Sequence, residues 1–168
     1  MVVNNGKLCF GKCITSGSID VGELKWSDGT GTNTSLGARN DLYLSEANTG
    51  DNQRGVHIKL GVGAATPTEE DIWLAETEVD GVDINTIITC STASMSSSGG
   101  NPVYTFTFYN NSSTETYTVK EICLCTDPSK SGLSRPTGAF IMLARKVLAM
   151  PRTIAPHETV VFAYEIVF

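Results

Sequence analysis

The sequence predicts an all-β protein, an antiparallel β-sandwich of Ig-like or jelly-roll-like type with an irregular N-terminal arm. From residue 54 onward, short segments alternate apolar and polar residues, which is the period of half-buried strands. Clusters of Gly, Ser, Asn and Pro separate most of these segments. The chain has 40% hydrophobic and 18% charged residues, a globular balance, and no long run of helix-forming residues.

The N-terminal third differs from the rest. Residues 1–53 carry short apolar pieces at 8–14, 19–26 and 41–44, separated by turn-forming clusters rich in Gly, Ser and Asn. We therefore expect an arm of extended segments and loops over residues 1–53, which could reach onto a neighbouring molecule. Residues 54–168 are the predicted sandwich domain.

The sandwich strands follow in order along the chain. Val56, Ile58 and Leu60 alternate with His57 and Lys59, so this strand is expected to turn its histidine outward. The segment 140–148 is apolar enough to be buried on both faces, and two prolines at 151 and 156 bracket a connector after it. The only predicted helical turn is 67–74, where a threonine could cap and acidic residues favour the positive helix end. The predicted strands span 56–60, 83–95, 104–109, 117–125, 140–148 and 159–168.

Charge and hydropathy limit the partners of the chain. The net charge is −6 and the basic residues are scattered, which argues against binding to nucleic acid or an anionic membrane. No run approaches the roughly 18 apolar residues of a membrane span, and no secretion signal is visible. We therefore expect synthesis in a cytosol, where the cysteines stay reduced.

Two glycine and cysteine patterns suggest chemistry but have simpler interpretations. Gly61-Val62-Gly63 follows a strand like a phosphate-binding turn, yet the third glycine and a Lys-Ser/Thr pair are missing, so a tight turn is favoured. Four cysteines could supply thiolates to zinc, but the second pair is too closely spaced, and buried cysteines commonly behave as small hydrophobes. A disulfide within that second pair is also disfavoured by strand geometry. These cysteines are Cys9, Cys13, Cys123 and Cys125.

The remaining polar candidates point to no enzyme. Nucleophilic catalysis needs a histidine beside a nucleophile and a carboxylate, and neither His57 nor His157 has a recognisable partner. A group of carboxylates near one turn matches no calcium loop and is expected to be a solvated acidic loop. Its members are Glu76, Glu78, Asp80 and Asp83. We expect no catalytic residue, no metal and no cofactor.

Three stretches of the chain have a familiar pattern: Val3-Asn4-Asn5-Gly6, then 58–63 with Pro67-Thr68 and 71–74, and finally 106–110, 119–124, 143–145 and 154–168. They resemble small structural proteins of tailed-bacteriophage particles: tail, collar, fibre-base and capsid-decoration components. The resemblance covers about two thirds of the chain, and residues 15–53 have no clear counterpart. Cys123 and His157 stand where that group often has glycine.

The resemblance implies assembly rather than catalysis. We expect a non-enzymatic virion component, made in the bacterial cytoplasm, that binds copies of itself in a ring or trimer and docks onto capsid or tail proteins. The candidate interface residues are Leu8, Phe10, Trp26, Trp73 and Arg145, since Trp and Arg are enriched at interface hot spots. The alternatives are a receptor- or carbohydrate-binding module that uses Tyr43, Trp26 and Tyr109, and a zinc-dependent or thiol enzyme.

Overall fold

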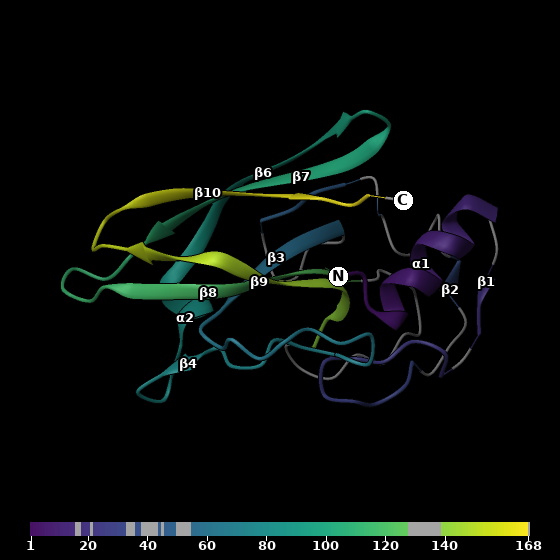
Figure 1. The fold of residues 1–168 in the computed structure, drawn as a ribbon, viewed down its shortest axis with the longest axis horizontal. Helices are drawn as coiled ribbons and strands as arrows, with labels where there is room; N and C mark the ends of the chain where they lie inside the picture. Colours follow the sequence, from purple (N-terminus) through teal and green to yellow (C-terminus); the bar gives the residue numbers. More distant parts are fainter. Residues whose placement is uncertain are drawn as a thin grey trace.

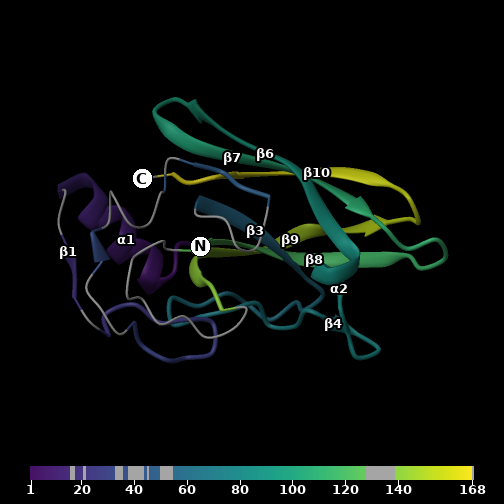
Figure 2. The same cartoon turned by 180° about the vertical axis from the view of Figure 1, so that it is seen from behind.

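The computed structural model is an antiparallel sandwich of two three-stranded sheets, one lying over the other (Figures 1 and 2). The structure describes residues 1–15, 18–20, 22–32, 36–37, 44, 46–49, 55–127 and 139–167. One sheet has the strand order β10-β7-β6 and the other β3-β8-β9. The predicted all-β sandwich is confirmed. The principal strands are β3 (Gly55–Gly61), β6 (Ile88–Ser98), β7 (Asn101–Asn110), β8 (Tyr117–Asp127), β9 (Ile141–Ile154) and β10 (Thr159–Glu165).

Smaller elements decorate the sandwich. Helix α1 (Asn4–Thr15) lies at one end of the molecule, beside the short ladder of β1 (Ser18–Ile19) and β2 (Leu36–Gly37) (Figure 1). The hairpin of β4 (Glu78–Val79) and β5 (Val82–Asp83) leads into the single turn of α2 (Ile84–Ile87). Neither of these helices has the length and apolar character needed to cross a membrane.

The main core lies between the two sheets. The inward aromatic residues of β7 are buried, as are the inward residues of β10, and they share one cluster with inward residues of β3 and β8. Each such aliphatic or aromatic side chain contributes roughly 1.5–3 kcal/mol when it is removed from water. The cluster members from the sheets include Val56, Ile58, Leu60, Tyr104, Phe106, Phe108, Ile122, Leu124, Val160, Phe162 and Tyr164.

The prediction of a half-buried strand at residues 56–60 is wrong, because the outer face that carries His57 is buried as well. His57 is only 2% exposed and Lys59 9%, because a second apolar cluster covers the outer face of β3. Phe140 contacts both side chains. Its ring packs edge-on against the His57 ring, with the two ring centroids 5.6 Å apart, and the Lys59 ammonium lies 4.9 Å from the Phe140 centroid. The sheet β3-β8-β9 is therefore buried on both faces along much of its length.

The predicted extended arm contains a helix, which is a correction. Residues 1–3 pair with β9, where the Val3 N–H donates to the Leu143 carbonyl at 3.2 Å. Helix α1 then packs on β9 so closely that a Cβ at Gly6 would lie 1.9 Å from the Leu143 oxygen. Its two glycines lower the intrinsic helix propensity, so tertiary contact outweighs the local signal. Apolar side chains of residues 10–44 also join the main core.

Two further local predictions are wrong. Residues 67–74 form no helix: the Thr68 N–H donates to the Asp71 carboxylate at 2.9 Å, and this single turn does not continue. Pro151 does not end β9, which runs on to Ile154. The β8–β9 register shifts between Val119 and Glu121, and Pro151 lies on the opposite strand within that irregularity, where its missing N–H breaks no ladder bond.

Gly61 and Gly63 are glycines for a different reason from the predicted tight turn. Neither residue has a positive φ, and Gly61 is the last residue of β3. A Cβ at Gly61 would lie 2.6 Å from Cγ of Glu121, and one at Gly63 would lie 2.7 Å from Oε1 of the same side chain. The backbone here leaves room for a fully buried carboxylate.

Gly61→Ala should therefore destabilise the fold by about 1–3 kcal/mol, the usual cost of inserting a methyl group into a filled interior. The measurement is urea unfolding. Gly11→Ala is the matched control, because a Cβ at this position of α1 meets nothing within 4 Å. The control should gain about 0.5–1 kcal/mol from its better helix propensity. Equal stability of the two variants would contradict this account.

Candidate functional site

The structure places the five predicted interface residues inside or against the core. Trp26 is 1% exposed, Phe10 7% and Arg145 3%, so none of these three presents a side chain on the surface. Leu8 and Trp73 are half-buried and pack against the two apolar clusters. Trp73 stacks on Phe140 with the ring centroids 6.1 Å apart. Large side chains of this kind are as common in cores as at interfaces, and in this protein they pack in or against the core.

The aromatics predicted for glycan binding do not form one exposed platform. Tyr43 lies outside the described residues, and Trp26 is buried. Tyr109 is half-buried on β7, where its hydroxyl lies 2.9 Å from Nδ1 of His157. His157 itself occupies a turn with φ 60°, between Ala155 and Glu158.

The residues considered for metal or thiol chemistry are dispersed. Cys123 and Cys125 belong to the second apolar cluster, whereas Cys9 belongs to the main core; the side chain of Cys13 lies outside the described part. Among the residues that the structure describes, no three His, Cys, Asp or Glu side chains gather closely enough to hold a metal ion. Of the acidic loop, Asp83 caps α2 by accepting a hydrogen bond from the Asn85 N–H at 2.9 Å.

Arg145 forms the centre of a buried ionic network. Its Nε donates to the Glu121 carboxylate at 2.7 Å, and its Nη1 donates to Asp71 at 2.6 Å. Its Nη2 donates to the carbonyl of Ala65 at 2.9 Å. Glu121 is fully buried, and its other oxygen accepts the Glu76 N–H at 3.1 Å. Arg145 was predicted as an interface residue, but its guanidinium is buried and pairs within its own chain.

The network shifts the pKa values of Asp71 and Arg145. Partial burial alone would raise the pKa of Asp71, but hydrogen bonds from Thr68 and Arg145, together with the charge of Arg145, lower it below the ordinary value. Burial would lower the pKa of Arg145, and its bonds to Asp71 and Glu121 raise it instead. The ionic forms are thus favoured, as expected of a structural ion pair.

The outer face of the sheet β10-β7-β6 has a distinct composition. Its side chains alternate with the buried ones on the three strands, and the strand register sets them in rows of three. Seven are Ser or Thr, and Glu165 at one end is the only charged member. The rows are Thr89-Tyr109-Thr159, Thr92-Thr107-Val161, Ser94-Thr105-Ala163 and Ser96-Val103-Glu165.

The apolar and aromatic members of this outer face are Val103 and Tyr109 on β7 and Val161 and Ala163 on β10. Val161 is 58% exposed there, and Val167 follows the strand at 69%. None of the outer-face residues was among the predicted interface residues. The signal was present in the sequence as the Ser/Thr-rich run of 91–98 and as the Thr residues that alternate with Phe106, but only the strand register assembles them into one surface.

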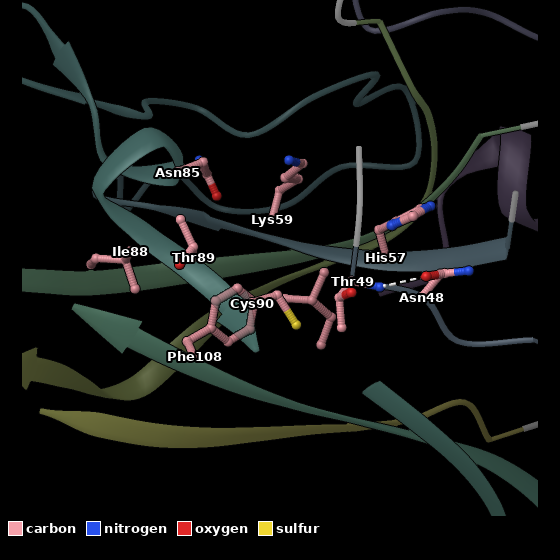
Figure 3. Close-up of a pocket in the computed structure, with 10 residues that line it drawn as sticks. Asn48, Thr49, His57, Lys59, Asn85, Ile88, Thr89, Cys90 and Phe108 are labelled. Atoms are coloured by element: carbon pink, nitrogen blue, oxygen red, sulfur yellow. Dashed lines mark hydrogen bonds between the residues drawn. The ribbon is translucent and has the colours of Figure 1, made fainter. Parts of the chain in front are cut away.

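A pocket of about 250 Å³ opens between the edges of the two sheets, where β3 and β6 lie on the same side of the sandwich (Figure 3). Residues 48–49 and Asn85 flank it, and Ile58 lies between them on β3. Cys90 and Phe108 come from the opposite sheet, as Figure 3 shows. This pocket could not be predicted from the sequence, because its shape depends on how the edges of the two sheets meet.

Removal of the Arg145 charge should cost much more stability than removal of an exposed one. In Arg145→Met, Glu121 is left buried without its partner, and we expect a loss of about 3–5 kcal/mol in the free energy of unfolding. Lys7→Met is the control, because Lys7 pairs with Glu69 at half-exposed positions and should lose less than about 1 kcal/mol. The double variant Arg145→Met/Glu121→Met should recover part of the loss; additive losses would refute the pairing.

The contribution of Asp71 should depend on pH. The folded-state pKa of Asp71 lies below the ordinary value of about 3.9. The ionised carboxylate therefore contributes its full stabilisation of the fold at any pH above about 3.9. The stabilisation is lost as the pH falls through the folded-state pKa. Chemical unfolding of the wild type and Asp71→Asn between pH 7 and pH 2 should show a difference that shrinks with acidification. A constant difference over this range would rule out the assignment.

Comparison with known proteins assigns no family to the chain. No protein-family model matches it, and neither a curated protein nor a solved structure does.

Proposed function

We propose that this chain is a non-enzymatic structural component of a tailed-phage particle, which assembles by binding a second copy of itself through the outer face of the sheet β10-β7-β6. The virion context rests on the resemblance of residues 58–74 and of the C-terminal strands to phage structural proteins. The observation that carries the assembly is the nearly uncharged outer face.

The choice of partner follows from charge. Each copy carries a net charge of −6, so two copies repel one another over most orientations. The outer face carries only Glu165, at one end of the rows, and two copies can approach there with little repulsion. Depletion of charged residues is also one of the features that distinguish the centre of a protein interface from the remaining surface.

The side chains of the outer face are suited to contact between sheets. Ser, Thr, Ala and Val are small or compact, so another sheet can approach to about 10 Å, the spacing of stacked sheets. The Ser and Thr hydroxyls can donate and accept hydrogen bonds across the contact. A face that binds the same face of another copy generates a two-fold dimer. A ring or trimer in the particle would need a second contact, either between copies or with capsid or tail proteins.

Val161→Glu should disrupt this self-association. It places two new carboxylates near one another across the contact, and we expect the dimer dissociation constant to rise at least tenfold, or about 1.4 kcal/mol. Analytical ultracentrifugation over a concentration series measures this. The matched control is Val82→Glu, because Val82 is also an exposed valine, at 42%, but lies on β5 away from the outer face.

Two results would count against the proposal. If the wild-type protein stayed monomeric at millimolar concentration, the proposed self-association through this face would be contradicted. Equal weakening by Val161→Glu and Val82→Glu would show that the added charge acts through the whole molecule and not through a contact at β10. Labelling of phage particles with an antibody to the chain tests the virion context separately.

A further inference from the structure

Among the residues that the structure describes, no named strand pairs with one edge of β3, and backbone groups on this edge are bound by other parts of the chain. Val56 shows which residues face this edge. Its N–H donates to the Glu46 carbonyl at 2.7 Å, and its carbonyl accepts the Asn48 N–H at 2.9 Å. Because backbone groups of alternate residues point to the same side of a strand, Ile58, Leu60 and Val62 face the same edge.

Two of these residues are also bound. The side-chain amide of Asn85 binds both groups of Leu60: its Oδ1 accepts the Leu60 N–H and its Nδ2 donates to the Leu60 carbonyl, each at 2.9 Å. The Val62 N–H donates to the Glu76 carbonyl at 2.8 Å. The chain thus closes the β3 edge above and below Ile58 with groups that are not strands of the sheet.

Ile58 is the exception. In the described part of the chain, no hydrogen-bond partner stands opposite its edge-facing N–H and carbonyl. The pocket between β3 and β6 lies at this position, bounded by residues 48–49 on one side and Asn85 on the other (Figure 3). A backbone donor and acceptor that lack a partner in a largely enclosed place favour a bound group that supplies both.

We propose that this pocket binds a primary carboxamide, which pairs with the N–H and carbonyl of Ile58. The Asn85 side chain already makes this arrangement two residues along the same edge, at Leu60. A carboxamide offers one acceptor and one donor in a plane, which matches the two backbone groups of a single strand residue. It is also uncharged, so its burial carries no charge penalty.

The volume of the pocket limits its occupant to a single small chemical group. A volume of about 250 Å³ is below the roughly 300–1,000 Å³ of pockets that hold drug-sized ligands. A full additional strand does not fit, because residues 46–48 and Asn85 occupy the edge on both sides of Ile58. The occupant is therefore a carboxamide that enters end-on, either as a small molecule or as the side chain of Gln or Asn from another protein.

Hydrogen exchange of the full-length protein tests the open position first. The Ile58 amide should exchange at least tenfold faster than the amides of Val56 and Leu60, which are hydrogen-bonded on the same edge. Saturating propionamide should slow the exchange of Ile58 at least fivefold and shift its amide resonance in a ¹⁵N-¹H spectrum. N,N-dimethylpropionamide, which has no N–H to donate, should do neither.

The source of the carboxamide is distinguished by a second probe. N-acetylglutamine methylamide presents the same group on a peptide: binding of both probes indicates that a protein side chain can enter, and binding of propionamide alone indicates a free small molecule. Cys90→Leu should abolish the effect of propionamide by filling the pocket, whereas Ser91→Leu, at the neighbouring exposed position, should leave it unchanged. Exchange of Ile58 as slow as that of its neighbours, or an equal response to both propionamides, would overturn the proposal.

Discussion

The ion pair between Arg145 and Glu121 joins four parts of the chain, and the sheet β3-β8-β9 is arranged around it. Glu121 comes from β8, Arg145 from β9, and Asp71 and Ala65 from the segment that follows β3, while Gly61 at the end of β3 and Gly63 just after it provide the space. The removal of two charges from water costs several kcal/mol per ion, so the net contribution of such a pair to stability is small. Its main consequence is positional, because displacement of one of these segments would leave a buried charge of Glu121 or Arg145 with fewer partners.

The two sheets of the sandwich meet different surroundings as a result. The sheet β3-β8-β9 has a second apolar cluster on its far side, held by the segment that the Arg145 network fixes. The sheet β10-β7-β6 has no such layer among the described residues, and its outer face consists of Ser and Thr residues with few apolar side chains. The surface left for binding is thus on the sheet farther from the ionic network, which explains why the buried charges and the proposed contact share no residues.

The fold class and most strands could be predicted because alternation is a local property. Phe106 and Phe162 sit in patterns that only a half-buried strand satisfies. The helix over residues 4–15 could not be predicted, since Gly6 and Gly11 weaken its local signal and contact with Leu143 replaces it. The burial of His57 and the pairing of Arg145 depend on partners that are remote in sequence. The outer face and the open edge at Ile58 arise from strand register and from the meeting of sheet edges, which no local pattern encodes.

The pairing of residues 1–3 with β9 has a consequence for the order of events during synthesis. Val2 bridges Ala144, so these residues leave the ribosome long before the strand that receives them exists. Until β9 is made, the side of α1 that packs on this strand has no surface to cover it, and contacts between residues so distant in sequence form slowly. The nascent chain must therefore carry its first helix unfolded or shielded, and the docking of this helix is expected to be a late step that completes the native protein.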